Sequence, residues 1–265
     1  MTWSQVDRDE LLRLSDHDPF VRFATSSEIV AVAAPDGWAC VGPWRPGSGH
    51  WGGAAVVGAS AVRSSESQAL AAIVEAGGED LALEWFSTSE DRPLSLPGPY
   101  ASTGSGHWSF MWTEHDSGLD ARAELSARGL AVDDLDDHRD AALIESFGAA
   151  HSDGRYMGFP GFGFATAWLA VRDRADDIVA VGALHELASG MPHLAGIIVR
   201  PDLRGHGLGG LLTQELTARA VEEAGVSTLS VFTDNAGAIA LYERLGYAVA
   251  HRFHTRELAP AGHLV

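Results

Sequence analysis

A segment of four closely spaced glycines, Arg204–Gly210, constrains the fold of this chain more than any other feature. The apolar run Leu194–Val199 before it predicts a strand, and Leu208–Glu223, with leucines at helical spacing, predicts a helix. Glycines at such a junction let the backbone approach a ligand, while the first N–H groups of the helix carry partial positive charge. This predicts an anion site that suits pyrophosphate, with Arg200 and Arg204 able to pair with its oxygens. The alternative is that the glycines serve only the packing of the helix start.

Two kinds of phosphate site compete for this segment. Gly205, Gly207 and Gly210 match the G-x-G-x-x-G pattern of dinucleotide-binding folds, and Asp234 follows about where a ribose-binding acid is expected. In that pattern the first glycine turns the chain directly off the strand. Here Arg200–Arg204, which includes a proline, intervenes, and no repeated strand–helix–strand succession follows. The dinucleotide interpretation therefore ranks second.

A second motif favours a different cofactor. Arg204-x-x-Gly207-x-Gly209 resembles the pyrophosphate loop of the GCN5-related N-acetyltransferases (GNAT). Some thirty residues later, the segment Thr233–Tyr247 contains Asn235, an alanine, Leu-Tyr-Glu and Leu-Gly-Tyr, which resembles the second signature of that family. The two motifs occur in family order and at family spacing. The resemblance covers about Leu130 to Phe253.

The resemblance implies a mixed-sheet α/β fold, the GNAT acyl-CoA N-acyltransferase fold. It implies an N-acetyltransferase that moves an acetyl group from acetyl-CoA to a primary amine by direct attack in a ternary complex, without a metal. The residues matched to the coenzyme A site are Ile197, Ile198, Val199, Arg204, Gly205, His206, Gly207, Leu208, Gly209, Gly210, Asn235, Ala238 and Tyr242. Another reading is a protein that binds coenzyme A without turnover.

The resemblance also suggests catalytic residues. Tyr242 matches the family tyrosine that protonates the leaving thiolate; the alternative is that its ring only packs and orients. An amine near pKa 10 must lose a proton before attack, and His193, His185 and Glu186 are the candidate bases, with a water chain as the alternative. The loop Asp153–Pro160 is expected to cover the acceptor.

The first part of the chain lies outside the resemblance. We expect an N-terminal domain at residues 1–122 and a catalytic GNAT domain at 123–265. Three strands, a helix and a strand are predicted in the same order in Glu28–Phe86 and in Ala167–Phe232, so the first domain is interpreted as a degenerate copy. The segment Gly58–Ser65 stands where that copy would carry the glycine loop, but it lacks the motif. We therefore expect no coenzyme A binding there.

Three further segments complete the expected secondary structure. Val6–Leu14 is expected to be a short helix, and the Ser/Pro/Gly-rich stretch Ser87–Gly106 a loop. The acidic run Asp133–Asp137 is expected to begin a helix that extends to about Ala149, because carboxylates favour the positive end of a helix dipole.

Composition narrows the class of partner. The formal net charge is −18, and all 18 basic residues are arginine. Such a surface repels nucleic acid, and it either attracts amine-bearing substrates or only keeps the protein soluble. With one cysteine, no long apolar stretch and a polar start, we expect a cytoplasmic protein with no internal disulfide, metal or membrane segment. The expected partner is a small-molecule or peptide amine. The sequence leaves the oligomeric state open, although homodimers are common in the family that it resembles.

Overall fold

The computed structural model describes residues 2–260 except 79–80, 99, 153 and 155–157. Its strands are β1 (Ser4–Val6), β2 (Val30–Ala34), β3 (Gly37–Pro43), β4 (Trp51–Val57), β5 (Leu83–Ser89), β6 (Tyr100–Thr113), β7 (Ala131–Leu135), β8 (Ala165–Arg172), β9 (Ile178–Glu186), β10 (Pro192–Val199), β11 (Ser227–Phe232) and β12 (Ala248–Pro260). Its helices are α1 (Arg8–Leu14), α2 (Pro19–Ala24), α3 (Ser65–Gly77), α4 (Ala121–Ala127), α5 (Ala141–His151), α6 (Leu208–Ala224) and α7 (Ala236–Arg244), with one 3₁₀ turn, η1 (Pro201–Leu203). None of these helices is both long and apolar enough to cross a bilayer.

All twelve strands form one mixed sheet, in the order β1-β2-β3-β4-β5-β12-β6-β11-β10-β9-β8-β7. The two halves of the sheet have the same strand order when each is read from its outer edge to the centre. Strands β1 to β5 followed by β12 form one half, and strands β7 to β11 followed by β6 form the other. In each half a helix, α3 or α6, connects two parallel strands, β4 to β5 and β10 to β11. The mixed-sheet α/β fold expected from the sequence is thereby confirmed.

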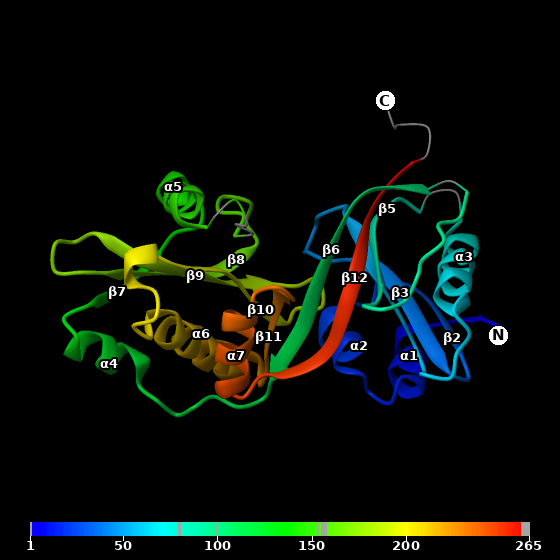
Figure 1. Ribbon diagram of the computed structural model, residues 1–265, viewed down its shortest axis with the longest axis horizontal. Helices are drawn as coiled ribbons and strands as arrows, with labels where there is room; N and C mark the ends of the chain where they lie inside the picture. Colours follow the sequence, from blue (N-terminus) through cyan, green and yellow to red (C-terminus); the bar gives the residue numbers. More distant parts are fainter. Residues whose placement is uncertain (1, 79–80, 99, 153, 155–157, 261–265) are drawn as a thin grey trace.

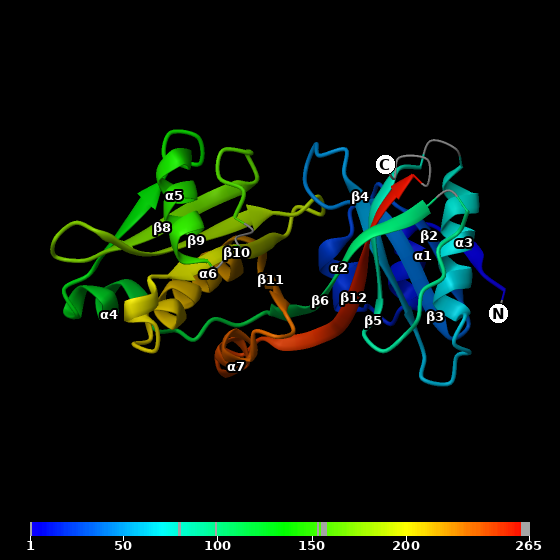
Figure 2. The same ribbon diagram turned by 45° about the horizontal axis from the view of Figure 1, so that its top comes forward.

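The last strand of each half is exchanged with the other half. β6 follows β5 in the chain but pairs with β11, whereas β12 pairs with β5. The two exchanged strands also pair with each other along almost their whole length, and they run side by side through the middle of the molecule (Figures 1 and 2). Neither half therefore completes its sheet without a strand from the other.

Helices cover the second half on opposite faces of the sheet (Figure 1). Leucines of α6 pack with Leu194 of β10 and with β11, and residues of α7 pack against the same cluster. α5 packs on the other face, through Ile144 and Phe147, against Trp168 and Ile198. The site is therefore framed by α6 and α7 on one face and by α5 on the other.

Aromatic side chains join the two halves at the exchanged strands. Phe253 of β12 is fully buried, and its ring lies 5.4 Å from Phe20 of α2 and 5.1 Å from Trp108 of β6. Phe110 of β6 is 5.3 Å from Phe20. These contacts place much of the first half's tryptophan and phenylalanine content in this central core.

Two expectations about local structure were wrong. Ser87–Gly106 is not a loop throughout, since β5 extends to Ser89 and β6 begins at Tyr100. The exchanged strand β12 pairs with Ser87, Thr88 and Ser89 on one side and with Ser102, Gly104, Ser105 and Gly106 on the other, so these small polar residues occupy strand positions. The acidic run Asp133–Asp137 lies partly in β7, and α5 begins only at Ala141. Asp133 and Asp134 instead form ion pairs with Arg122, Arg172 and Arg219. These arginines, and not the dipole of a helix, stabilise the negative charge of the two carboxylates.

Candidate active site

The site begins where two parallel strands separate. β10 and β11 pair at only two positions of the described chain, His193 with Thr228 and Leu194 with Leu229. The pairing of β10 with β9 shifts register between Ala195 and Ile198, so β10 bends away at this point. Backbone groups of Ile197–Val199 on the side of β11 lie beyond the last of these pairs. Such groups are suited to donate hydrogen bonds to an extended ligand that enters the opening.

The glycine loop follows directly on this opening. β10 ends at Val199, the turn η1 intervenes, and α6 begins at Leu208. Gly205 and Gly207 have φ angles of +80° and +82°, which L residues with a Cβ rarely adopt. Gly207 is the N-cap of α6, so the cap provides no side chain to bond the first N–H groups. These N–H groups and the helix dipole are suited to an anion, as the glycine pattern predicts.

The position of η1 also bears on the choice of cofactor. In the dinucleotide-binding pattern the first glycine closes the turn at the end of the strand. Here Pro201–Leu203 form a helical turn between β10 and Gly205. The geometry therefore favours the coenzyme A interpretation of the loop.

The arginines around the loop have partners within the protein. Arg204 donates to the carbonyl of Val199 at 3.1 Å and to that of His151 at 2.5 Å, so it ties the loop to α5. Arg200 pairs with Asp202 at 2.8 Å, and this carboxylate raises the pKa of the guanidinium. A residue that the sequence did not single out, Arg128, donates to the carbonyl of His206 at 3.0 Å. Arg128 thus places a cation beside the loop from the end of α4.

Tyr242 lies on α7, whose start is fixed by the second motif. Asn235 is the N-cap, and its side chain accepts from the N–H of Ala238 at 3.1 Å. This bond gives both residues a structural role at the helix start. Leu241 packs at the start of α6, since its side chain would lie 3.3 Å from a Cβ added at Gly210. Of the matched residues, Asn235 is therefore the helix cap and Ala238 donates to it, while α7 is held next to the glycine loop.

The Tyr242 side chain is half-buried against the core shared by α6 and β10. Its ring centroid is 5.9 Å from that of Tyr247. Burial, followed by the neighbouring Tyr247, raises the pKa of the Tyr242 phenol well above its usual value. The hydroxyl consequently keeps its proton across the working pH range and can act as a hydrogen-bond donor.

His193 has a defined tautomer. The Oγ1 of Thr228 donates its only hydrogen to the carbonyl of Pro192 at 2.7 Å. The 2.9 Å contact between this Oγ1 and Nδ1 of His193 therefore requires the proton on Nδ1. Nε2 then carries a lone pair, and no described residue bonds it. Burial, followed by the charge of Arg45 and by His185, holds the pKa of His193 well below its usual value, so the ring is neutral at pH 7.

His185 stands opposite His193 on the neighbouring strand. Its Nε2 is 2.9 Å from the carbonyl of Gly158 and therefore donates, which leaves the lone pair on Nδ1. Burial, then Arg45, lowers the pKa of His185 to about 3. Glu186, the third candidate base, has an exposed side chain. The structure thus brings His193 and His185 together and places Glu186 on the surface at the strand end.

The expected acceptor loop is described only in part. Asp153, Arg155, Tyr156 and Met157 lie outside the described residues. Gly158 is buried and bonded to His185, and the exposed Phe159 begins an aromatic group with Phe162 and Phe164. The described end of this loop therefore borders the two histidines.

In the first half, the position that corresponds to the glycine loop, at the start of α3, is filled by side chains of the protein. Glu66, in the first turn of α3, is fully buried and accepts from the N–H of Ser89 at 3.1 Å. Arg92 donates to the carbonyls of Gly58, Ala61 and Val62 in the preceding loop. A carboxylate and a guanidinium thus occupy the region that the glycine loop leaves open in the second half.

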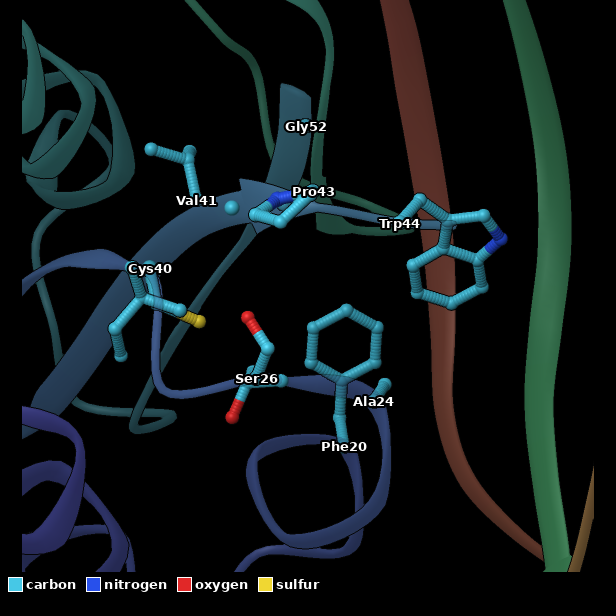
Figure 3. A pocket seen from close by; sticks show the side chains of 12 residues that line it. Phe20, Ala24, Ser26, Cys40, Val41, Pro43, Trp44 and Gly52 are labelled. Atoms are coloured by element: carbon cyan, nitrogen blue, oxygen red, sulfur yellow. The ribbon is translucent and has the colours of Figure 1, made fainter. Parts of the chain in front are cut away.

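In the first half, a cavity of about 10 Å³ lies between β3, β4 and α2, bordered by Phe20, Cys40 and Trp44 (Figure 3). Such a volume accommodates about one water molecule. The burial of Cys40, which raises the pKa of its thiol to about 12, fits an inert core residue.

Comparison with known proteins agrees with this geometry. The sequence model of the acetyltransferase (GNAT) family matches residues 132–247. A GNAT-family acetyltransferase structure from Novosphingobium aromaticivorans is similar with a TM-score of 0.53 and 17% identity, over 94% of this chain and 96% of that one. A Drosophila protein of known structure is similar with a TM-score of 0.53 and 12% identity, over 97% and 98% of the two chains. These likenesses extend over both halves of the sheet, and they concern the fold. No curated protein matches the sequence.

Proposed function

We propose that the protein transfers an acetyl group from acetyl-CoA to a primary amine, because residues 132–247 match the model of the acetyltransferase (GNAT) family. One observation carries the proposal. β10 and β11 separate after two paired positions, and the opening leads directly to the glycine-capped start of α6. A long ligand with a pyrophosphate at one end and a thioester at the other matches an open strand edge followed by an anion site.

Each step of the reaction has a candidate group. The backbone of Ile197–Val199 stabilises the charge that develops on the thioester oxygen, because preorganised N–H donors act most strongly there. The amine attacks in its neutral form, and Nε2 of His193 accepts the proton that the attacking nitrogen loses once its bond to the carbonyl carbon has formed, because that nitrogen is then a much stronger acid. The hydroxyl of Tyr242 donates a hydrogen bond to the leaving sulfur. A free thiol has a pKa of about 8.5, below that of this buried phenol, so we expect Tyr242 to stabilise the thiolate more than to surrender its proton.

The direct test is release of the coenzyme A thiol from acetyl-CoA across a broad panel of primary amines. Release that saturates with one amine class, together with the acetylated product by mass spectrometry, would support the proposal. Saturable acetyl-CoA binding without turnover on any amine would instead support a binding module. A thermal shift with NADH but not with coenzyme A would favour the dinucleotide interpretation.

The glycine loop gives a prediction about affinity. Gly207→Val should lower acetyl-CoA affinity by roughly tenfold or more, because a β-branched residue resists φ near +82° and the cap must move. Isothermal titration calorimetry measures the change. Gly225→Val is the matched control, since Gly225 has φ +72° at the other end of the same helix. Both variants should lose stability, but equal losses of coenzyme affinity would contradict the assignment of the loop.

The assignment of His193 predicts a loss of rate that persists across pH. His193→Gln can retain a bond to Thr228 but lacks a basic nitrogen, so kcat should fall by about 10²-fold. Both enzymes need the neutral amine, because a histidine of lowered pKa cannot deprotonate a free ammonium, so both rates should rise between pH 7 and 9 and the variant should stay below wild type throughout. His115→Gln, at an exposed position, is the control. A His193→Gln rate equal to that of wild type across this range would show that His193 is not the base.

A further inference from the structure

A buried arginine from the first half lies against the candidate site in the second half. Arg45 is in the loop between β3 and β4, and only 9% of its surface is exposed. Its Nη1 is 3.5 Å from the carbonyl of Glu186, and its guanidinium carbon is 5.8 Å from the ring centre of Phe164. The loop is held in place because the N–H of Ala188 donates to the carbonyl of Trp44 at 3.0 Å. The exchanged halves thus bring a guanidinium to the end of β9.

The charge of Arg45 has no counter-ion within the described chain. No ion pair joins it to any carboxylate of the described residues, although the protein contains 36 acidic residues. Burial lowers the pKa of Arg45 to about 10, which reflects the cost of keeping this cation out of water. A buried charge is normally paired, and one long carbonyl contact and one aromatic ring satisfy only part of a five-donor group. The described residues around Arg45 therefore lack the anion that a buried guanidinium normally has beside it.

The neighbouring histidines, by contrast, have nitrogen lone pairs for which the described residues provide no hydrogen-bond donor. Nδ1 of His185 is buried and has no hydrogen-bond partner. By the tautomer argument above, Nε2 of His193 also carries an unshared lone pair. Arg45 belongs to the same cluster as the two histidines, because its charge lowers the pKa of both His185 and His193. Trp44, the residue before Arg45, also has its ring 5.8 Å from that of His193. The cluster combines hydrogen-bond acceptors suited to an amine with a cation suited to an anion.

We propose that Arg45 binds a carboxylate of the acceptor, so that the acceptor is an amino acid or another amine that also bears a carboxylate. This inference rests on the proposed function, since it names the acceptor of that same site. A planar guanidinium binds a carboxylate through two parallel hydrogen bonds, which would also orient the amine toward the histidines. A bound carboxylate would offset the positive field of Arg45 on His193 and His185, the two titratable groups of the cluster. Asp137 is the acid whose charge also acts on His185 and raises its pKa. Binding would then strengthen the base when the amine is in place.

The test uses pairs of probes that differ only in the carboxylate. Glycine with glycinamide, alanine with alaninamide and phenylalanine with phenylalaninamide are compared in wild type, Arg45→Met and Arg45→Lys. In wild type at least one acid should be preferred to its amide. Arg45→Met should lower kcat/KM for that acid by roughly 10–100-fold, mainly through KM, and leave the KM of its amide nearly unchanged. Arg45→Lys should recover part of the loss. Arg13→Met, at an exposed position, is the control and should change neither.

The outcomes separate this inference from the proposed function. Equal losses for acid and amide in Arg45→Met would show a purely structural role and overturn the inference, while turnover itself would still support the acetyltransferase. If no probe is acetylated, calorimetry of the same probes in the presence of coenzyme A decides. Binding of an acid to wild type but not to Arg45→Met would support the carboxylate site without turnover. Absence of any acid preference in both assays would overturn it.

Discussion

Replacement of Tyr242 by phenylalanine should lower kcat by about 10²–10³-fold, the usual effect of removing one donor to a charge that develops in the transition state. The ring and its contacts with the core remain, so acetyl-CoA affinity should change little. The proton of this hydroxyl is held firmly by burial, so the effect should be nearly independent of pH between 6 and 9. Single-turnover kinetics with a saturating amine would measure the chemical step directly.

Tyr247→Phe provides the matched control for this experiment. Tyr247 is the neighbouring ring, and its hydroxyl bonds Ser227 at 2.6 Å and Thr217 at 2.7 Å within the core. Its loss should cost about 1–3 kcal/mol of stability through two buried groups left unpaired, with kcat nearly preserved. If the single-turnover rate of Tyr242→Phe equals that of wild type, the hydroxyl has no part in the reaction and Tyr242 serves only to pack its ring.

The second large effect concerns the exchanged strands. Phe253→Ala should lower the free energy of unfolding by about 3–5 kcal/mol, because it removes a fully buried aromatic side chain and leaves a cavity. Such a loss is a large part of the 5–15 kcal/mol that typically stabilises a domain. Urea unfolding followed by tryptophan fluorescence is suited to the measurement, since Trp108 lies 5.1 Å from Phe253.

The form of the transition is as informative as its midpoint. β12 pairs with both β5 and β6, so both halves of the sheet should lose stability together in one transition. Phe162→Ala, at a side chain that is 66% exposed, is the control and should change stability by at most about 0.5 kcal/mol. Two separate transitions, with only one shifted by Phe253→Ala, would show that the halves unfold independently.

Much of the second half could be predicted because its signals are local. The strand, the glycine loop and the helix α6 depend on hydropathy and on glycines at φ angles that other residues avoid. The family resemblance and the mixed-sheet fold are confirmed. The roles of Tyr242, His193 and the coenzyme A residues, and the domain division at residue 122, stay predictions.

The rest depends on contacts between distant segments. Nothing near Ser102 or Gly104 in the sequence indicates a strand, because the partner that makes it one, β12, lies some 150 residues away. The importance of Arg45 and Thr228 likewise follows from their neighbours in space. Arg45 stands out only because no carboxylate accompanies it in the described structure, and Thr228 only because its hydrogen is already donated.

The exchange of β6 and β12 also has a consequence for how the protein is made. As the chain leaves the ribosome, β5 is synthesised long before β12, so one edge of the first half stays unsatisfied until nearly all of the described chain has emerged. An exposed strand edge of this kind readily pairs with other chains. The nascent protein must therefore tolerate an open edge during translation, and a ribosome that stalls before β12 would release a fragment prone to aggregate.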